Sequence, residues 1–348
     1  RVRGAGDAPE VPGPGGALLE LTALDRIASV DGAACIARVE AGCSMAALEA
    51  AAGREGCTLG ALLPSVRAGS VGHWLAGPTG GERGIPGSRR ETAALSVTAV
   101  LASARIAESR AVPRSAAGPD LDHLALGGAG RLAVIAAAVI RLLPEAPLLA
   151  VSWEAGSTGA AVEALARFCL DRLAPTRVRL AVLPDGSVRL AAGFEGSRSA
   201  QLLRQRAART ARHLFKELRE IRSGELRDER SEGDAAAAFL RAPAPAHAVE
   251  IDADWECLRS WALQPAASAP GSELALCGLH AGGAFAVLSV PGEGDQPADA
   301  SAVSAREAGA RVIAPRRLRA RAQPWEELGG GQVWRRLVAA LGVEEEQP

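Results

Sequence analysis

The sequence predicts an α+β fold in which an antiparallel sheet is covered by helices. Up to Pro144, short runs with a strand-like pattern alternate with glycine-rich turns. After Pro147, the predicted order is strand, helix, two strands, helix and then further strands. That order is typical of an antiparallel sheet with helices on one face. The two prolines close the first half of the chain, so we expect a domain boundary at 147/148.

The first half contains predicted strands that pair locally and two short helices. Residues 35–40 alternate apolar and polar side chains, as a half-buried strand does. Ser44 is placed to cap a helix that Gly56 then ends. Val134 and Ile135 are β-branched and favour a strand over a helix. The expected strands are 18–21, 35–40, 95–102, 106–108 and 131–142, and the expected helices are 45–55 and 120–126.

The second half has longer helices between its strands. The turn Pro184-Asp185-Gly186 separates two predicted strands. Residues 201–222 carry apolar side chains at helical spacing. The charged segment 223–234 is predicted to be a loop or disordered, and 291–300 a mobile connection. The other expected strands begin at 151 or span 177–183, 187–192, 246–251, 273–279 and 284–290, and the other expected helices span 158–173 and 332–341.

Composition excludes several classes of protein. Lys and Arg number 39 and Asp and Glu 40, so the chain lacks the cationic surplus of a general nucleic-acid binder. The longest apolar run, Leu132–Leu143, falls short of the ~18 residues of a membrane span. The six cysteines form no C-x-x-C pair, which predicts buried free thiols and no metal site. We expect a cytoplasmic protein with a small-molecule substrate and neither nucleic acid nor a membrane span as partner.

Three glycine-rich stretches are candidates for ligand binding: Arg3–Asp7, Pro64–Ala76 and Gly127–Ile135. Glycine allows backbone N–H groups to approach a phosphate or a ring closely. None of the three is a phosphate-binding P-loop or has the strand–glycine–helix context of a Rossmann site.

Taken in order, these stretches resemble the FAD-binding domain of FAD-linked oxidases of the vanillyl-alcohol oxidase type, also described as a PCMH-type domain. Residues 23–65 follow that family's strand-rich pattern, in which V-E-A-G, here Val39 to Gly42, closes a strand before a helix. GSVGHWLAGPTGG (69–81) is similar to the family's T-V-G-G segment along the flavin, and 113–147 is similar to its P-R-x-S-x-G-P-D-L, G-S-E-G and G-V-I-T run. Within the family, the resemblance is closest to alkylglycerone-phosphate synthases, followed by glycolate oxidase flavin subunits.

This resemblance implies an FAD-binding domain of two subdomains at 1–147, incomplete at its N-terminus. It also implies an antiparallel-sheet cap, the substrate domain, at 148–308, and a segment at 309–348 that returns to the FAD domain. FAD is the implied cofactor, extended so that its isoalloxazine lies at the cap boundary. The residues that the resemblance assigns to FAD are Gly4, Ala5, Gly6, Asp7, Ser65, Ser70, Val71, Gly72, Trp74, Asp120, Gly127, Gly130, Val134 and Ile135.

The residues expected to act on the substrate depart from the family pattern. Ala314-Pro315-Arg316 occupies the place of consecutive family histidines, and the chain has no tyrosine for the synthases' active-site position. His280 and His73 are the imidazoles available as a catalytic acid or base, although a strand-end or packing role is open for each. Arg316, Arg317 and Arg319 are candidates to bind a substrate phosphate or carboxylate, with a solvated edge or an intersubunit ion pair as the alternative.

Two functions follow from the resemblance and its departures. The first is an FAD-binding oxidoreductase that acts on a small 2-hydroxy acid or a phosphate ester. The second is a catalytically impaired flavoprotein-fold subunit, a possible pseudoenzyme, that partners an active homologous flavin subunit. Loss of the histidines and of tyrosine favours the second, and the persistent glycine framework favours at least the fold.

Overall fold

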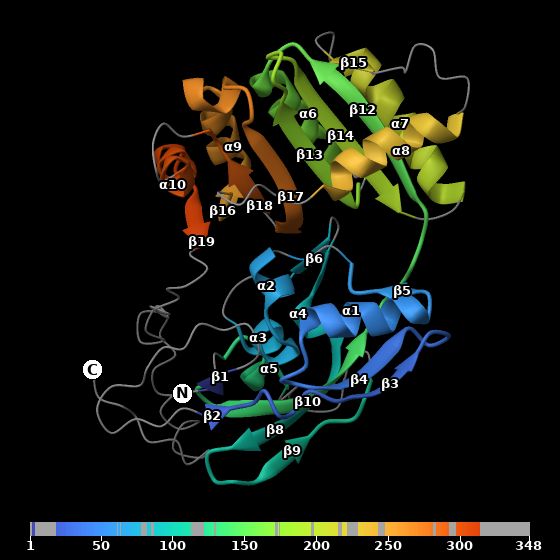
Figure 1. The fold of residues 1–348 in the computed structure, drawn as a ribbon, viewed down its shortest axis with the longest axis vertical. Coiled ribbons are helices and arrows are strands. Elements are labelled where there is room, and N and C mark those ends of the chain that lie inside the picture. Colours follow the sequence, from blue (N-terminus) through green and yellow to red (C-terminus); the bar gives the residue numbers. More distant parts are fainter. Residues whose placement is uncertain are drawn as a thin grey trace. The chain divides into compact units, whose positions relative to one another are not determined.

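A computed structural model of the chain shows two compact units, one built from residues 1–82 and 88–145 and the other from 83–87 and 146–314 (Figure 1). The functional domains with limits at 147 and 308 stay predictions. No helix in the described part of the chain is long and apolar enough to cross a membrane. The structure describes residues 2–3, 19–60, 62, 64–77, 82–84, 87–112, 122–128, 130–170, 173, 175–195, 198–214, 218–220, 229–242, 248–280, 283–291 and 297–313.

The first unit is organised around an antiparallel sheet with the strand order β3-β4-β10-β8-β9. Strand β10 lies at its centre, between β4 and β8. The strands are β1 (Val2–Arg3), β2 (Leu19–Glu20), β3 (Ile27–Asp31), β4 (Ile36–Glu40), β5 (Cys57–Thr58), β7 (Gly87–Arg89), β8 (Ala94–Leu101), β9 (Ile106–Glu108), β10 (Ala133–Arg141) and β11 (Leu143–Pro144). The helices are α1 (Met45–Arg54), α2 (Pro64–Ala68), α3 (Val71–Ala76), α4 (Arg90–Ala93) and α5 (Asp122–Ala125).

The predicted capping of helix α1 is confirmed. The Ser44 side chain accepts a hydrogen bond from the backbone N–H of Ala47 over 3.1 Å, which satisfies one free donor of the first turn. Gly56 follows the helix with a φ of 68°, in the left-handed region that glycine adopts without strain. The predicted pairing of 95–102 with 106–108 is also confirmed, as strands β8 and β9.

The second unit is built on a larger sheet with the path β15-β12-β14-β13-β17-β18-β16-β19. All neighbours along this path are antiparallel, which confirms the predicted sheet type. The strands are β6 (Glu82–Gly84), β12 (Leu148–Ala155), β13 (Arg177–Val182), β14 (Val188–Glu195), β15 (Leu218–Glu220), β16 (Val249–Asp254), β17 (Glu273–His280), β18 (Gly283–Ser289) and β19 (Arg311–Ile313). The helices are α6 (Thr158–Leu170), α7 (Arg198–Leu214), α8 (Glu229–Arg241), α9 (Trp255–Ala262), the 3-10 turn η1 (Pro265–Ser268) and α10 (Pro297–Glu307).

One face of this sheet carries the main core of the second unit. Trp153 of β12 and Phe168 of α6 are fully buried, with ring centroids 5.1 Å apart. Trp261 of α9 and Ala207 of α7 belong to the same apolar cluster. Helices α6, α7 and α9 therefore cover this face. The sequence predicts a helix at the positions of α6 and α7, whereas α9 was not predicted.

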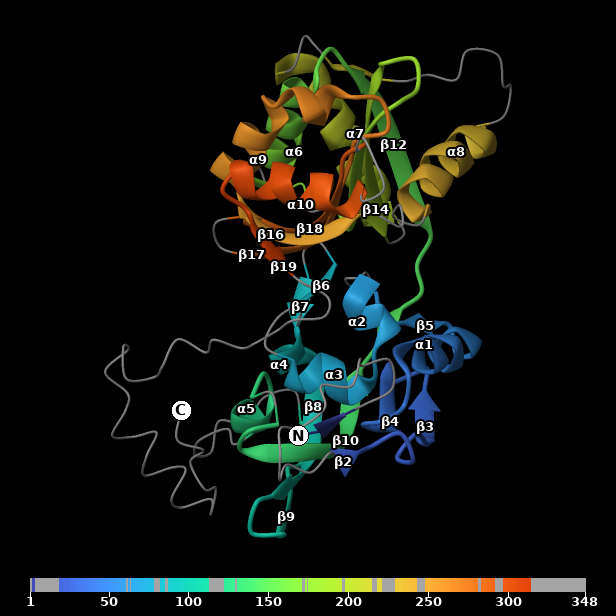
Figure 2. The same ribbon diagram turned by 60° about the vertical axis from the view of Figure 1, so that its left-hand side comes forward.

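Helix α8 covers part of the opposite face, which corrects the expectation that the helices lie on one face. Ala150 and Ala191 point away from the main core and form a second cluster with Ala236, Ala237 and Leu240 of α8. Figure 2 shows strands β12 and β14 between α8 and the helices of the other face. Both faces of the sheet are therefore packed at this end.

The structure also corrects three boundaries in the second unit. The helix predicted at 201–222 ends at Leu214, because Leu218 is buried as part of the edge strand β15, which pairs with β12. The segment 229–234, predicted to be a loop, is the start of α8, and 297–300, predicted to be a mobile connection, is the start of α10. The helix predicted at 332–341 lies outside the described residues.

Candidate functional site

The glycine-rich segment at 69–72 packs backbone to backbone against residues 41–45, which include the end of the V-E-A-G segment. The N–H of Val71 donates to the Cys43 carbonyl over 2.9 Å, and the N–H of Gly72 donates to the Ala41 carbonyl over 2.7 Å. In the other direction, the N–H of Met45 donates to the Gly69 carbonyl over 3.0 Å. The segment implied to lie along the flavin is thus joined by backbone hydrogen bonds to the end of V-E-A-G and the residues that follow it. The N–H groups of Val71 and Gly72 have acceptors inside the fold.

Helix α3 follows directly and, with its capping residue, positions Ser70, His73 and Trp74. Ser70 is buried and caps the helix, because its side chain accepts a hydrogen bond from the N–H of His73 over 3.1 Å. Trp74 is fully buried in the first unit. His73 is half-buried, and its ring lies over Gly69, where a Cβ would come within 2.9 Å of the imidazole. Ser65 is half-buried on the neighbouring short helix α2.

A buried arginine connects α3 to the glycine-rich loop at 127–130. The Arg90 guanidinium donates to the carbonyls of Trp74, over 3.3 Å, and Gly77, at the C-terminal end of α3. A cation is favourable there because the carbonyls at a helix C-terminus carry partial negative charge. The same guanidinium lies beside Gly127, whose N–H donates to the Leu75 carbonyl over 2.8 Å. Nothing in this arginine-rich sequence singled out Arg90, since it stands in none of the recognised motifs.

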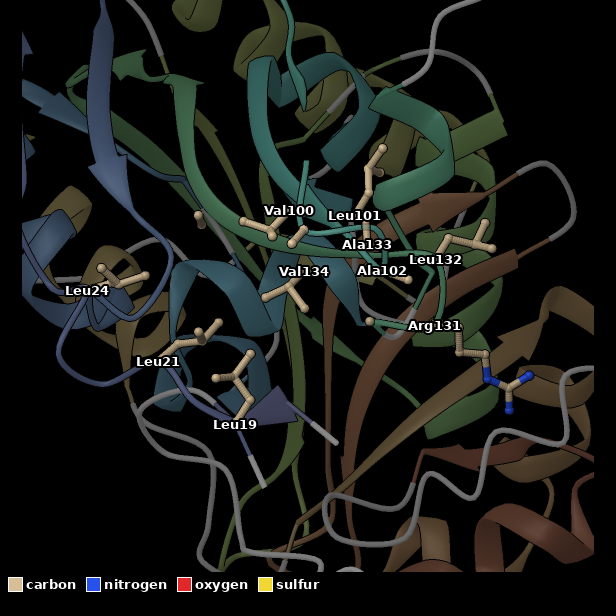
Figure 3. Close-up of a pocket in the computed structure, with 13 residues that line it drawn as sticks. Leu19, Leu21, Leu24, Val100, Leu101, Ala102, Arg131, Leu132, Ala133 and Val134 are labelled. Atoms are coloured by element: carbon tan, nitrogen blue, oxygen red, sulfur yellow. The ribbon is translucent and has the colours of Figure 1, made fainter. Parts of the chain in front are cut away.

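The glycine loop leads into β10 and to a pocket in the first unit with a volume of about 420 Å³. Figure 3 shows Leu19 of β2, with Leu21 and Leu24 from the segment after it, on one side of the pocket and Val100 and Val134 on the other. The Arg131 guanidinium extends away from these three leucines. The lining is almost entirely apolar. It consists of Leu19, Leu21, Leu24, Val100, Leu101, Ala102, Ala104, Gly130, Arg131, Leu132, Ala133, Val134 and Ala136.

Two of the residues that the resemblance assigned to the cofactor, Gly130 and Val134, line this pocket. Gly130 has a φ of 72°, a conformation that favours glycine, so the loop turns sharply at the pocket wall. Ile135 follows Val134 on the strand and is buried on the opposite side, as strand alternation requires. The leucines of the far wall were not anticipated, although the predicted strand at 18–21 contains two of them.

The pocket fits part of an FAD molecule. Its volume falls within the range of about 300–1,000 Å³ of small-molecule sites, and its apolar walls suit a flat heteroaromatic ring. It offers no described cluster of cations for the pyrophosphate, which the resemblance assigns to Gly4, Ala5, Gly6 and Asp7. Those four residues, together with Asp120, lie outside the described residues.

The candidate substrate residues are not assembled by the described structure. His280 ends strand β17 of the second unit and pairs with Gly283 across the hairpin, and its side chain is not among those described. His73 lies in the first unit. Arg316, Arg317 and Arg319 lie outside the described residues. Their substrate roles stay predictions.

Comparison with known proteins finds an FAD binding domain in the first part of the chain. Residues 1–110 match the family described as FAD binding domain. A stretch of 143 residues is 26% identical to alkyldihydroxyacetonephosphate synthase of Caenorhabditis elegans and covers 41% of this chain. The chain spans about a quarter of that relative's length, since the match covers 24% of it.

Solved structures share the fold over nearly the whole chain. Two structures of alkyldihydroxyacetonephosphate synthase superpose with TM-scores of 0.63 and 0.67, at 15% and 14% sequence identity. They cover 93% and 98% of this chain, which in turn covers 66% and 70% of theirs. FAD, the predicted cofactor, is the ligand that the matched domain family is named for. Residues 1–110 thus match an FAD binding domain, and the chain shares the α+β fold of the two alkyldihydroxyacetonephosphate synthase structures.

Proposed function

We propose that the chain is an FAD-dependent oxidoreductase whose first unit holds the cofactor. The observation that carries this proposal is the apolar pocket, because its wall contains Gly130 and Val134, which the resemblance assigned to FAD independently of the structure. The match of residues 1–110 to an FAD binding domain supports the same assignment.

Each part of the site has a separate role in this proposal. Bound FAD supplies the two-electron redox chemistry, and the protein supplies binding, orientation and exclusion of water. The leucines and valines of the pocket keep water from one ring system of the cofactor. Arg90 holds the glycine loop against α3 through Gly127 and the carbonyls of Trp74 and Gly77, so the loop keeps its shape beside the pocket.

The proposed substrate is a small 2-hydroxy acid or a phosphate ester. Oxidation of a hydroxyl group requires a group that accepts its proton, and His280 or His73 is the proposed acceptor. Arg316, Arg317 and Arg319 are proposed to bind the substrate's carboxylate or phosphate by paired hydrogen bonds.

A second candidate function is a non-catalytic subunit that binds an active homologous flavin subunit. The residues at the expected catalytic positions favour this candidate. Ala314 and Pro315 cannot exchange protons, Arg316 stays protonated, and the chain contains no tyrosine. The fold would then serve assembly and need not turn over substrate.

The visible absorbance spectrum of the purified chain tests the proposal. We expect flavin bands, either as purified or after reconstitution with FAD and removal of the excess. Anaerobic addition of 2-hydroxy acids and of phosphate esters then separates the two candidates, because only the oxidoreductase lets substrate bleach those bands. A chain that neither carries nor takes up FAD contradicts the oxidoreductase.

Filling the pocket is expected to weaken FAD binding without unfolding the chain. Val134 is half-buried and faces the pocket, so Val134→Trp places an indole in the space proposed for the cofactor ring. We expect at least a tenfold weaker affinity, measured by titration of flavin fluorescence. Val303→Trp is the matched control, because Val303 is 48% exposed on α10 of the second unit. Equal FAD affinity for the Val134 variant and the wild type would remove the pocket from the proposal.

A further inference from the structure

Two cysteines that are 22 positions apart in the sequence meet in the first unit. The sulfur atoms of Cys35 and Cys57 lie 3.7 Å apart. Both thiols point at one acceptor, the Gly32 carbonyl, at 3.4 Å from Cys35 and 3.7 Å from Cys57. The pair belongs to neither the pocket nor any glycine-rich motif.

The backbone on both sides of the pair is fixed by one segment. The N–H of Leu142 donates to the Cys35 carbonyl over 2.7 Å, and Pro144 pairs with Cys57 between β11 and β5. The N–H of Glu145 donates to the carbonyl of Gly56 over 2.7 Å. Because one short segment holds both cysteines, their sulfur atoms are kept close by the fold.

The turn that contains Cys35 is also held in place, by its contact with the end of α1. A Cβ on Gly32 would come within 2.4 Å of the Glu55 carbonyl, so this turn lies directly against the end of α1. Cys35 itself has a φ of 52°, in the left-handed region that non-glycine residues seldom occupy. The surrounding contacts therefore impose the conformation of Cys35.

The two thiols differ in access. Cys35 is half-buried, whereas Cys57 is only 2% exposed. Burial, together with Cys35 and the nearby carboxylates of Glu55 and Asp31, raises the pKa of the Cys57 thiol to about 11. A thiolate is the nucleophile in disulfide exchange, so a reagent from solution meets Cys35 first.

From this geometry we propose that Cys35 and Cys57 form an oxidation site that small-molecule disulfides convert into an intramolecular disulfide. The Cys35 thiolate attacks one sulfur of the reagent, forms a mixed disulfide and expels one molecule of the reagent's thiol. The Cys57 sulfur then attacks the Cys35 sulfur, loses its proton and expels the second thiol. The protein loses two hydrogens and two electrons, and the reagent gains them as two thiols.

The new bond requires only a short approach of the two sulfur atoms. A disulfide has an S–S distance of about 2.05 Å, so the atoms move together by less than 2 Å from the 3.7 Å seen here. The bridge closes a loop that contains β4 and α1. It links the β3–β4 turn to β5 and restricts the unfolded chain, which stabilises the folded unit.

Oxidised glutathione is the probe that tests this site on the full-length chain. After oxidation, denaturation and alkylation with iodoacetamide, mass spectrometry is expected to find a Cys35–Cys57 crosslink that lacks two hydrogen masses. Cys43 and Cys257 are internal controls. Cys43 is 1% exposed and is expected to react with iodoacetamide only after denaturation. Half-buried Cys257, whose thiol contacts Asp254, is expected to keep any glutathione that it gains.

Two variants separate the steps of the reaction. In Cys57→Ala, Cys35 is expected to retain bound glutathione, because no second thiol displaces it. In Cys35→Ala, Cys57 is expected to stay unmodified. Circular dichroism of the reduced variants shows that each is folded. A wild-type chain that retains glutathione on Cys35 overturns the proposal, as does one in which neither cysteine reacts or Cys57 reacts without Cys35.

Discussion

Replacing Arg179 with methionine is expected to detach helix α8 from its sheet. We expect the free energy of unfolding to fall by about 3–5 kcal/mol, the usual range for breaking a buried ion pair. Arg179 is 5% exposed on β13. Its guanidinium donates to the carbonyls of Phe239 and Ala242, over 3.1 and 2.6 Å, and to the Glu273 carboxylate over 2.5 Å. Methionine keeps much of the volume but leaves these three acceptors without their cation.

The loss of stability is expected to be concentrated in α8, because two of the carbonyls that Arg179 contacts lie at the end of this helix. Phe239 and Ala242 stand at the C-terminal end of α8, where backbone carbonyls lack partners within the helix. The guanidinium also lies 5.2 Å from the centre of the Phe239 ring, and that of Arg189 lies 5.7 Å from it. Arg179 therefore binds the helix through its last turn and through an aromatic side chain of the same turn.

Hydrogen exchange measured by mass spectrometry, together with urea unfolding, checks this prediction. We expect much faster exchange in 229–241 and a lower urea midpoint. Arg177→Met is the matched control, because Arg177 lies on the same strand as Arg179 and its ion pair with Glu195 of β14 is partly exposed. Such pairs contribute about 0–1 kcal/mol. Unchanged exchange in α8 of the Arg179 variant would show that the apolar contacts of Ala236, Ala237 and Leu240 hold the helix alone.

The same helix shows where sequence patterns stopped predicting the fold. Helix α1 was predictable because a capping serine and a terminal glycine act within a few residues. The charged beginning of α8, by contrast, gives no helical signal. The segment becomes helical because Ala236, Ala237 and Leu240 further along find a sheet surface to cover. That surface is formed by strands far away in the sequence.

The candidate site divides in the same way. Gly130 and Val134 were predictable because the glycine loop and the strand that follows it carry a family pattern over consecutive residues. Arg90 was not predictable, since its role depends on carbonyls at the end of α3 and on Gly127, which only the fold brings together. Leu19 and Leu21 were predicted as strand residues, but a strand pattern does not say which surface or pocket their side chains face.

Replacing Gly42 with alanine is expected to destabilise the first unit by about 3 kcal/mol, at the upper end of the usual cost of overpacking. A Cβ at this position would lie 1.9 Å from the Leu21 carbonyl oxygen and 2.8 Å from that of Leu24. Neither carbonyl can move aside cheaply. Leu21 accepts a hydrogen bond from the N–H of Leu24 over 2.9 Å, and Leu24 accepts one from Gly42 itself over 2.8 Å.

The same change at Gly53 is expected to act in the opposite direction. Gly53 lies inside α1 with nothing within 4 Å of an added Cβ, so alanine there stabilises the helix by about 0.5–1 kcal/mol. Urea midpoints of the two variants, measured beside the wild type, check the sign of each effect. Equal midpoints for Gly42→Ala and wild type would show that the Leu21–Leu24 segment is not packed as described.

The prediction for Gly42 also separates two reasons why a glycine can be required in this pattern: packing of the fold and binding of the cofactor. Gly42 ends the V-E-A-G segment, and the structure uses its missing side chain to bring β4 against the Leu21–Leu24 wall of the pocket. A chain that had lost FAD entirely would still need this glycine to fold. Gly42→Ala is therefore expected to lower the stability of the apoprotein and the FAD-loaded protein alike, whereas Val134→Trp is expected to lower only the stability that FAD adds. The unfolding temperatures of both variants, measured with and without FAD, distinguish a residue required for packing from a residue required for cofactor binding.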